Sequence, residues 1–180
     1  RMDSVATVTT EIAQLLDEIQ HGFPSVEATA AKRSFPIGPE SADEREIAAT
    51  TKILIVDDEP INVKVCQKYL QELGYKKCIG VSDATAAVTR IDEERPDLVI
   101  LDVMMPVVSG VEVLRQIRAN PALNHIPVLI LTASTDRNTK LALLELGASD
   151  FLTKPIDPSE LSPRVRNVLT VKRHRDSLKN

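Results

Sequence analysis

The stretch LVILDVMMP, at residues 98–106, decides which fold the sequence predicts. It opens with four uninterrupted apolar residues, and Asp102 comes directly after them. A short run that is apolar throughout is typical of a strand buried on both faces, as strands are in parallel sheets covered by helices. Four further apolar runs stand at residues 53–56, 78–81, 128–131 and 151–152.

Apolar residues at helical spacing follow each of these runs. After the first run they are Val65, Cys66, Tyr69 and Leu73. Pro60 suits the first position of that helix, and Gly74 suits the left-handed residue after it. Asp83 can cap the second helix, and Gly147 can end the fourth. Strands that alternate with helices over residues 52–161 predict an α/β fold built on a doubly wound, five-stranded parallel sheet.

Composition narrows the classes of function. The 180 residues suffice for one domain with tails, and the net charge of −4 makes a nucleic-acid partner unlikely. The apolar runs are too short for a membrane span, and no signal peptide opens the sequence. Cys66 and Cys78 lie in apolar stretches typical of packing in a reducing compartment, although a disulfide stays open. We therefore expect a cytoplasmic protein without a membrane partner.

Residues 1–51 differ in composition from the rest of the chain. They are rich in Ala, Thr and Ser, and three prolines interrupt their middle. We expect an N-terminal extension that is flexible or partly helical. The alternative is a docking or dimerisation helix over residues 8–21, where four apolar residues stand at helical spacing: Ile12, Leu15, Leu16 and Ile19.

The start of the last helix stays open at this point. Asp157, Pro158 and Glu160 have the residue types expected at the N-cap, first and third positions of a helix. Pro163 then falls inside that helix, where it removes a hydrogen bond and crowds the preceding turn. The helix either kinks at Pro163 or begins at Ser162.

The end of the chain, residues 171–180, is predicted to be a C-terminal linker helix that follows a domain at residues 52–170. An apolar stripe that starts before this segment continues into it between basic side chains and comprises Val165, Val168, Val171 and Leu178. One interpretation is a solvated last helix with cations near its C-terminus. The other is a helix that leads into a coiled coil or into an output domain beyond residue 180.

Charged and polar side chains follow four of the five predicted strands. They are Asp57, Asp58, Asp102, Thr132 and Lys154. Because the carboxyl ends of parallel strands meet at one edge of a sheet, we expect these side chains to gather in one crevice.

Such a crevice has a specific chemistry. Three neighbouring carboxylates repel one another, and a divalent cation relieves that repulsion. Oxygen ligands of high charge favour Mg²⁺ first and Mn²⁺ second. Lys154 would add a second positive charge, and Thr132 a hydrogen-bond donor. A carboxylate nucleophile with charge neutralisation beside it is what phosphoryl transfer requires.

Four segments carry a resemblance to a known family. KILIVDDEP at 52–60, LVILDVMMP at 98–106, VLILTAS at 128–134 and FLTKP at 151–155 resemble the signature blocks of response-regulator receiver domains. The blocks occur in the order of that family, within residues 52–170. The resemblance implies a flavodoxin-like sheet with strand order 2-1-3-4-5 and a stoichiometric phospho-acceptor of two-component signalling, not an enzyme with turnover.

The resemblance also implies roles for individual residues. Asp102 would accept the phosphoryl group from the phosphohistidine of a histidine kinase or phosphotransfer protein. Asp58, Asp102 and the backbone carbonyl of Met104 would bind Mg²⁺, and Asp57 would hold the ion largely through water. Lys154 would pair with Asp102 and then with a phosphoryl oxygen.

A switch is implied as well. Thr132 would turn towards the phosphoryl group, and Phe151 would repack at the position of the family's rotating aromatic residue. The bond between Lys154 and Pro155 is expected to be cis. A homodimer or the output domain would then read the face formed by the fourth helix, the fifth strand and the last helix.

Two other functions compete with this interpretation. A haloacid-dehalogenase-like phosphatase also uses an aspartate and Mg²⁺, but it needs a second aspartate where Met104 stands, and its nucleophile lies on the first strand. A receiver fold that serves only as a scaffold for protein–protein interaction would not be phosphorylated. The presence of all the phosphotransfer side chains argues against the scaffold.

Overall fold

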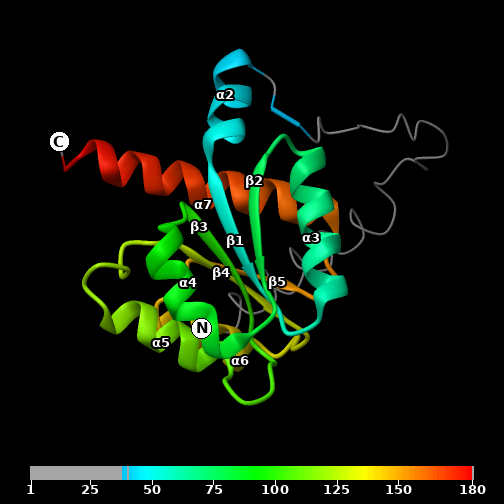
Figure 1. Ribbon diagram of the computed structural model, residues 1–180, viewed down its shortest axis with the longest axis vertical. Helices are drawn as coiled ribbons and strands as arrows, with labels where there is room; N and C mark the ends of the chain where they lie inside the picture. Colours follow the sequence, from blue (N-terminus) through cyan, green and yellow to red (C-terminus); the bar gives the residue numbers. More distant parts are fainter. Residues whose placement is uncertain (1–37, 40, 180) are drawn as a thin grey trace, which may run out of the picture. The chain divides into compact units, whose positions relative to one another are not determined.

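The computed structural model describes residues 38–39 and 41–179, which form an α/β structure around one five-stranded sheet (Figure 1). The strands are β1 Lys52–Val56, β2 Lys77–Val81, β3 Leu98–Asp102, β4 Val128–Thr132 and β5 Asp150–Thr153. They pair in parallel in the order β2-β1-β3-β4-β5. The predicted fold class and strand order are confirmed.

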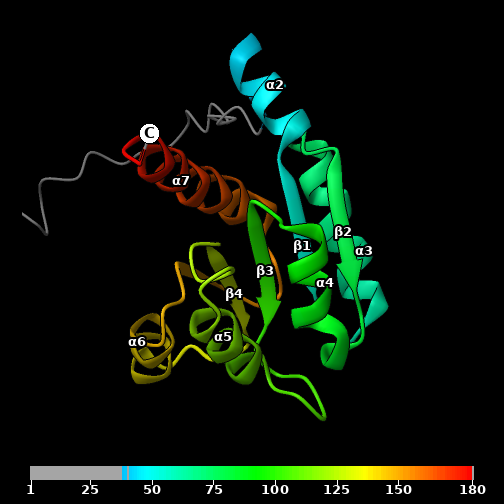
Figure 2. The same ribbon diagram turned by 60° about the vertical axis from the view of Figure 1, so that its left-hand side comes forward.

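Helices cover both faces of this sheet (Figure 2). The helices of the described residues are α2 Ala42–Thr50, which leads into β1, and α3 Pro60–Glu72, α4 Ala87–Glu94, α5 Gly110–Ala119, α6 Arg137–Glu145 and α7 Pro158–Ser177. Helices α4, α5 and α6 pack on one face, and α3 and α7 pack on the other. Successive residues of β1 alternate between the two cores, with Leu54 in one and Ile55 in the other. Both are fully buried, which explains why the strand is apolar throughout.

Turn residues end and begin these helices largely as the sequence predicts. Pro60 is the first residue of α3, and Gly74 and Gly147 take positive φ angles of 94° and 102° after α3 and α6. The cap at Asp83 differs in one respect. Its carboxylate accepts from the Thr85 backbone N–H at 2.9 Å and so caps a short 3₁₀ turn that precedes α4.

Helix α7 starts earlier than one of the two predicted alternatives. The Asp157 carboxylate accepts from the Ser159 backbone N–H at 2.8 Å, and the helix begins at Pro158. A start at Ser162 is therefore wrong, because Pro163 lies within the helix. Leu161 and Val165, on either side of that proline, are fully buried. Their burial and the cap offset the one backbone hydrogen bond that Pro163 removes.

Helix α2 lies within the predicted N-terminal extension and leads into β1 (Figure 1). The Ser41 hydroxyl accepts from the Glu44 backbone N–H at 3.1 Å, and the Glu44 carboxylate accepts from the Ser41 backbone N–H. This capping box was not recognised in the sequence. The helix considered at residues 8–21 lies outside the described residues. In the described part of the chain, no helix has the length and apolar character of a membrane span.

The two cysteines pack as the sequence suggests. Both are free thiols; Cys66 is fully buried and Cys78 half-buried. Burial raises the pKa of Cys66 to about 12 and that of Cys78 to about 11. Both thiols are therefore protonated and poorly nucleophilic at neutral pH.

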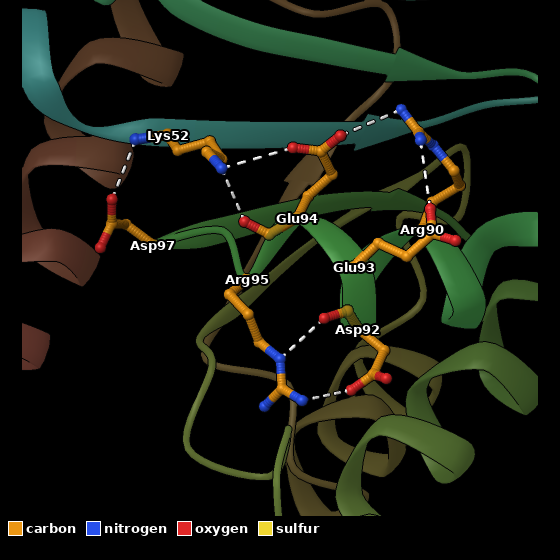
Figure 3. Close-up of polar contacts among 7 residues, drawn as sticks. All are labelled: Lys52, Arg90, Asp92, Glu93, Glu94, Arg95 and Asp97. Atoms are coloured by element: carbon orange, nitrogen blue, oxygen red, sulfur yellow. Dashed lines mark hydrogen bonds and ion pairs between the residues drawn. The ribbon is translucent and has the colours of Figure 1, made fainter.

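Ion pairs hold the amino-terminal edge of the sheet together (Figure 3). The Lys52 ammonium lies 3.3 Å from the Glu94 carboxylate and donates to the Glu94 carbonyl at 2.7 Å. The Lys52 backbone N–H donates to Asp97 at 2.9 Å. On α4, Arg90 pairs with Glu94 at 3.2 Å. These contacts fix the starts of β1 and β3 against the end of α4.

Candidate functional site

Three carboxylates gather at the opposite, carboxyl-terminal edge of the sheet. Asp57 directly follows β1, and Asp102 is the last residue of the neighbouring β3. With Asp58, each offers a carboxylate oxygen within 4.8 Å of the others. Asp57 is 1% exposed and Asp102 3%, while Asp58 is half-buried. The sequence prediction that these side chains converge is therefore met by the fold.

Lys154 reaches the same cluster from the end of β5. Its ammonium lies 2.8 Å from Asp57 Oδ2 and 3.1 Å from Asp102 Oδ1. The pair with Asp102 was expected, and the shorter contact with Asp57 was not. The peptide bond to Pro155 is cis, as the resemblance implies. Lys154 therefore bridges the two most buried carboxylates.

The charges in this cluster do not balance. Burial raises the pKa of Asp102, and the negative charge of Asp57 adds to that rise, while Lys154 opposes it. Burial would lower the pKa of Lys154, but its hydrogen bonds to Asp57 and Asp102 raise it above the ordinary value. Three carboxylates and one ammonium leave an excess of negative charge. A cation bound beside them would compensate for it.

A cavity of about 140 Å³ opens among these groups. It is lined by Asp57, Asp58, Glu59, Asn62, Asp102, Met104, Ala133 and Lys154. Its acidic lining presents carboxylate oxygens and no imidazole or thiolate, which suits a hard divalent cation. The residues present therefore fit a metal ion that keeps part of its water shell.

Two neighbours of Asp57 had no assigned role in the sequence. The Asn62 side-chain amide donates to Asp57 Oδ1 at 3.3 Å, and the Glu59 backbone N–H donates to the same oxygen at 3.0 Å. Both hold the carboxylate in place. A polar residue in the first turn of a helix that leaves the crevice is the signal that could have indicated Asn62.

Met104 and Gly110 shape the loop after β3. The Met104 backbone N–H donates to Asp102 Oδ1 at 3.3 Å, while the Met104 side chain is 74% exposed. Gly110 starts α5 so close to the strand that a Cβ atom there would lie 2.1 Å from the Asp102 carbonyl oxygen. Only glycine allows this close approach.

The two predicted switch residues lie outside the cavity lining. Thr132 ends β4 and is 2% exposed, and its hydroxyl accepts from the Ser134 backbone N–H at 3.1 Å. Phe151 is half-buried between α6 and α7. The Lys140 ammonium lies 4.7 Å from its ring centroid, and the Arg164 guanidinium lies 5.4 Å from it. The Phe151 ring is therefore in contact with two cations, one from α6 and one from α7.

The sequence that forms this site matches a family of known proteins. Residues 53–166 match the family model of the response regulator receiver domain. The chain belongs to this family. Receiver domains are phospho-acceptors in signalling, and the acidic pocket of Asp57, Asp58 and Asp102 is consistent with such a site.

Curated relatives share the receiver region. The chain is 42% identical over 118 residues to the alkaline phosphatase synthesis transcriptional regulatory protein PhoP of Bacillus subtilis. It is 38% identical over 130 residues to the response regulator PleD of Caulobacter vibrioides. These matches cover 66% and 72% of this chain, but only 48% of PhoP and 28% of PleD.

Solved structures of receivers are also similar. One is the receiver domain of sensor histidine kinase PA1611 from Pseudomonas aeruginosa PAO1, described with a magnesium ion coordinated in the active site cleft. It is 31% identical with a TM-score of 0.61, and the match covers 67% of this chain and 98% of that one. Chemotaxis protein CheY4 of Vibrio cholerae is 30% identical with a TM-score of 0.61, over 66% of this chain and 98% of that protein.

Proposed function

We propose that Asp102 accepts a phosphoryl group from the phosphohistidine of a histidine kinase or a phosphotransfer protein. The observation that carries this proposal is the cluster of three carboxylates with one lysine at the ends of β1, β3 and β5. A carboxylate oxygen of Asp102 attacks phosphorus as the bond between phosphorus and the histidine nitrogen breaks. The products are an aspartyl phosphate on this chain and a free histidine on the donor.

The ion in this proposal is Mg²⁺, with Mn²⁺ as a substitute. Asp57, Asp58, Asp102 and the backbone carbonyl of Met104 would hold it, and it would neutralise charge on the phosphoryl oxygens. Asn62 and the Glu59 backbone N–H orient Asp57 for that task. Lys154, already 3.1 Å from Asp102, moves to a phosphoryl oxygen.

The reaction changes a second face of the domain. Thr132 lies at the end of β4. Its hydroxyl breaks the hydrogen bond that it accepts from the Ser134 backbone N–H and binds the phosphoryl group instead. Phe151 then repacks between α6 and α7. A second copy of the chain or an output domain reads the resulting face of α6, β5 and α7.

The wider role of the protein is part of the same proposal. Residues 52–170 act as a stoichiometric phospho-acceptor in the cytoplasm, and residues 171–180 lead to an output domain beyond residue 180. Names such as the DNA-binding response regulator MtrA show that some relatives bind DNA. Contact with nucleic acid in this protein would then fall to the output domain, since the net charge of −4 gives this chain no general affinity for it.

Incubation with acetyl phosphate and Mg²⁺, followed by intact mass measurement, tests the proposal. We expect the addition of one phosphoryl group, and no addition in Asp102→Asn or in the presence of EDTA. Asp83→Asn is the matched control, because it removes an exposed cap at the end of another strand. Absence of any mass gain in the unaltered chain would favour the scaffold, and multiple turnover of p-nitrophenyl phosphate would favour the phosphatase.

A further inference from the structure

A second cavity lies far from the acidic one, at the amino-terminal edge of the sheet. Its volume is about 370 Å³, which is within the range of sites for small organic molecules. It is bounded by α7 and by the loops that precede β4 and β5. Because the strands are parallel, their amino ends lie at the edge opposite Asp102.

Arg118 forms one wall of this cavity. Its Nε donates to the Gly147 carbonyl at 2.8 Å, and its Nη1 donates to the carbonyls of Ile126 at 2.8 Å and Asn124 at 3.2 Å. A Cβ atom at Gly147 would lie only 2.9 Å from Arg118 Nε. The guanidinium is thus fixed against two loops by backbone carbonyls, and within the described residues no carboxylate pairs with it.

Arg175 of α7 lines the same cavity. In the part of the chain that the structure describes, its guanidinium has neither a hydrogen bond nor an ion pair. Burial lowers the pKa of Arg118, and the nearby charge of Arg175 lowers it further. Among the described residues, two guanidinium groups therefore line one cavity, and neither is paired with a carboxylate.

The other charges in the cavity are already paired. The Lys172 ammonium lies 2.7 Å from Asp176 and 3.4 Å from Asp97. The Asp150 carboxylate, which is the acid in the lining, accepts from Arg164 at 2.8 and 2.9 Å. The excess positive charge is therefore carried by Arg118 and Arg175.

We propose that this cavity binds a small organic phosphate monoester, with its phosphate between Arg118 and Arg175. A phosphate monoester carries close to two negative charges at neutral pH, which matches two guanidinium groups that have no carboxylate partner among the described residues, whereas one carboxylate would neutralise only one. The apolar side chains of Val168, Val171 and Pro127 line the rest of the cavity and can pack against the organic part of the ligand. The site is separate from the phospho-acceptor cluster and does not depend on it.

Titration with adenosine 5′-monophosphate in EDTA, at constant ionic strength and followed by amide chemical shifts, tests this site. EDTA keeps metal out of the acidic cavity, so that the nucleotide is not drawn there. We expect saturable shifts at Arg118, residues 147–150 and Arg175. Inorganic phosphate should shift the same amides more weakly, because it lacks the organic part.

Variants decide between a specific site and general attraction to a basic surface. Arg175→Gln should lower the affinity at least about tenfold, because charge-assisted hydrogen bonds are lost. Arg137→Gln removes the same charge at the start of α6 and should leave the affinity unchanged. Arg175 is the better target, because Arg118 also holds two loops together.

Four results would overturn the proposal. They are absence of saturable shifts, equal weakening by Arg175→Gln and Arg137→Gln, equal binding of adenosine, and equal binding of a dicarboxylate such as glutarate. None of them bears on phosphorylation of Asp102, which the intact-mass experiment measures separately.

Discussion

The two edges of the sheet differ in how well their carboxylates and cations balance. At the amino-terminal edge, carboxylates and cations are matched: Glu94 has Lys52 and Arg90, Glu93 has Arg90, and Asp92 has Arg95 (Figure 3). At the carboxyl-terminal edge, Asp57, Asp58 and Asp102 lie together, and the ammonium of Lys154 pairs with Asp57 and Asp102. Among the described residues, no ion pair is found for Asp58.

Burial increases the electrostatic free-energy cost of the unbalanced carboxylates at the carboxyl-terminal edge. The Arg90 and Glu93 side chains are 42% and 57% exposed, so water screens their interaction, and such pairs contribute about 0–1 kcal/mol each. Asp57 and Asp102 are almost wholly buried, where repulsion between like charges is screened far less. Buried like charges that lower stability in this way are typical of a functional site, and the acidic cluster could hold a cation.

Removal of the Lys154 ammonium should have the largest effect, and this effect is on the rate of phosphorylation. In Lys154→Ala, we expect phosphorylation by acetyl phosphate to slow on the order of 10²–10³-fold, because a charged donor to the transferring group is lost. The rate of mass gain measures this. Lys64→Ala, on the exposed side of α3, should react like the unaltered chain. Equal rates in both variants would remove Lys154 from the reaction.

The second-largest expected effect is a loss of Mg²⁺ affinity when the half-buried carboxylate of Asp58 is removed. Asp58→Asn should lower the Mg²⁺ affinity at least about tenfold in a calorimetric titration, because an ionic ligand becomes neutral. Asp92→Asn, at the opposite edge, should leave that affinity unchanged because Asp92 pairs only with Arg95 in the described structure. Similar losses in both variants would mean that Mg²⁺ responds to overall charge and not to this site.

A substitution at the amino-terminal edge of the sheet should instead lower the free energy of unfolding. Asp97→Ala removes the acceptor of the Lys52 backbone N–H and the ion pair with Lys172. We expect the free energy of unfolding to fall by about 1–2 kcal/mol. Urea denaturation measures this change, and the Mg²⁺ affinity should stay the same. A change in Mg²⁺ affinity would show that the two edges are coupled.

The smallest expected effect is a gain in the free energy of unfolding when Asp102 is replaced by a neutral residue. Because the pKa of Asp102 is raised by folding, its ionisation disfavours the folded state in the absence of metal. Asp102→Asn in EDTA at neutral pH should therefore raise the free energy of unfolding, on the order of 1 kcal/mol. Lys154 also lies 2.8 Å from Asp57 in the unaltered chain, so we expect its ammonium to retain a carboxylate partner in this variant.

The pH dependence of that gain has a defined sign. A raised folded pKa contributes stability that is present below the unfolded pKa and is lost as pH rises through the folded value. The advantage of Asp102→Asn should thus shrink as pH falls from neutral through the pKa of Asp102. Urea denaturation of both proteins over that range measures it, and an advantage that grows in acid would contradict this origin.

The strand ends could be predicted from the sequence because each follows a buried apolar run. Asp57 and Asp102 stand directly after such runs, Lys154 stands one residue beyond the last of them, and the parallel topology brings the three together. Asn62 was missed because its place in the crevice depends on how α3 leaves β1, which periodicity does not reveal. The contact of Lys154 with Asp57 likewise depends on a side chain that reaches past both β4 and β3 to the end of β1.

Local rules were less reliable where tertiary packing competes with them. Pro163 disfavours a helix interior, yet α7 continues through it because Leu161 and Val165 are buried on both sides. Arg118 and Arg175 are far apart in sequence, and nothing in their local patterns relates them. Only the packing of α5 and α7 against the loops before β4 and β5 brings them to one cavity.

The most direct test of the central claim is to locate the modified residue. The chain is treated with acetyl phosphate and Mg²⁺, reduced with borohydride, which converts an aspartyl phosphate to homoserine, and digested for peptide mass analysis. We predict homoserine at position 102 alone. Homoserine at Asp57 or Asp58, or unaltered Asp102 in protein that has gained a phosphoryl group, would contradict the account.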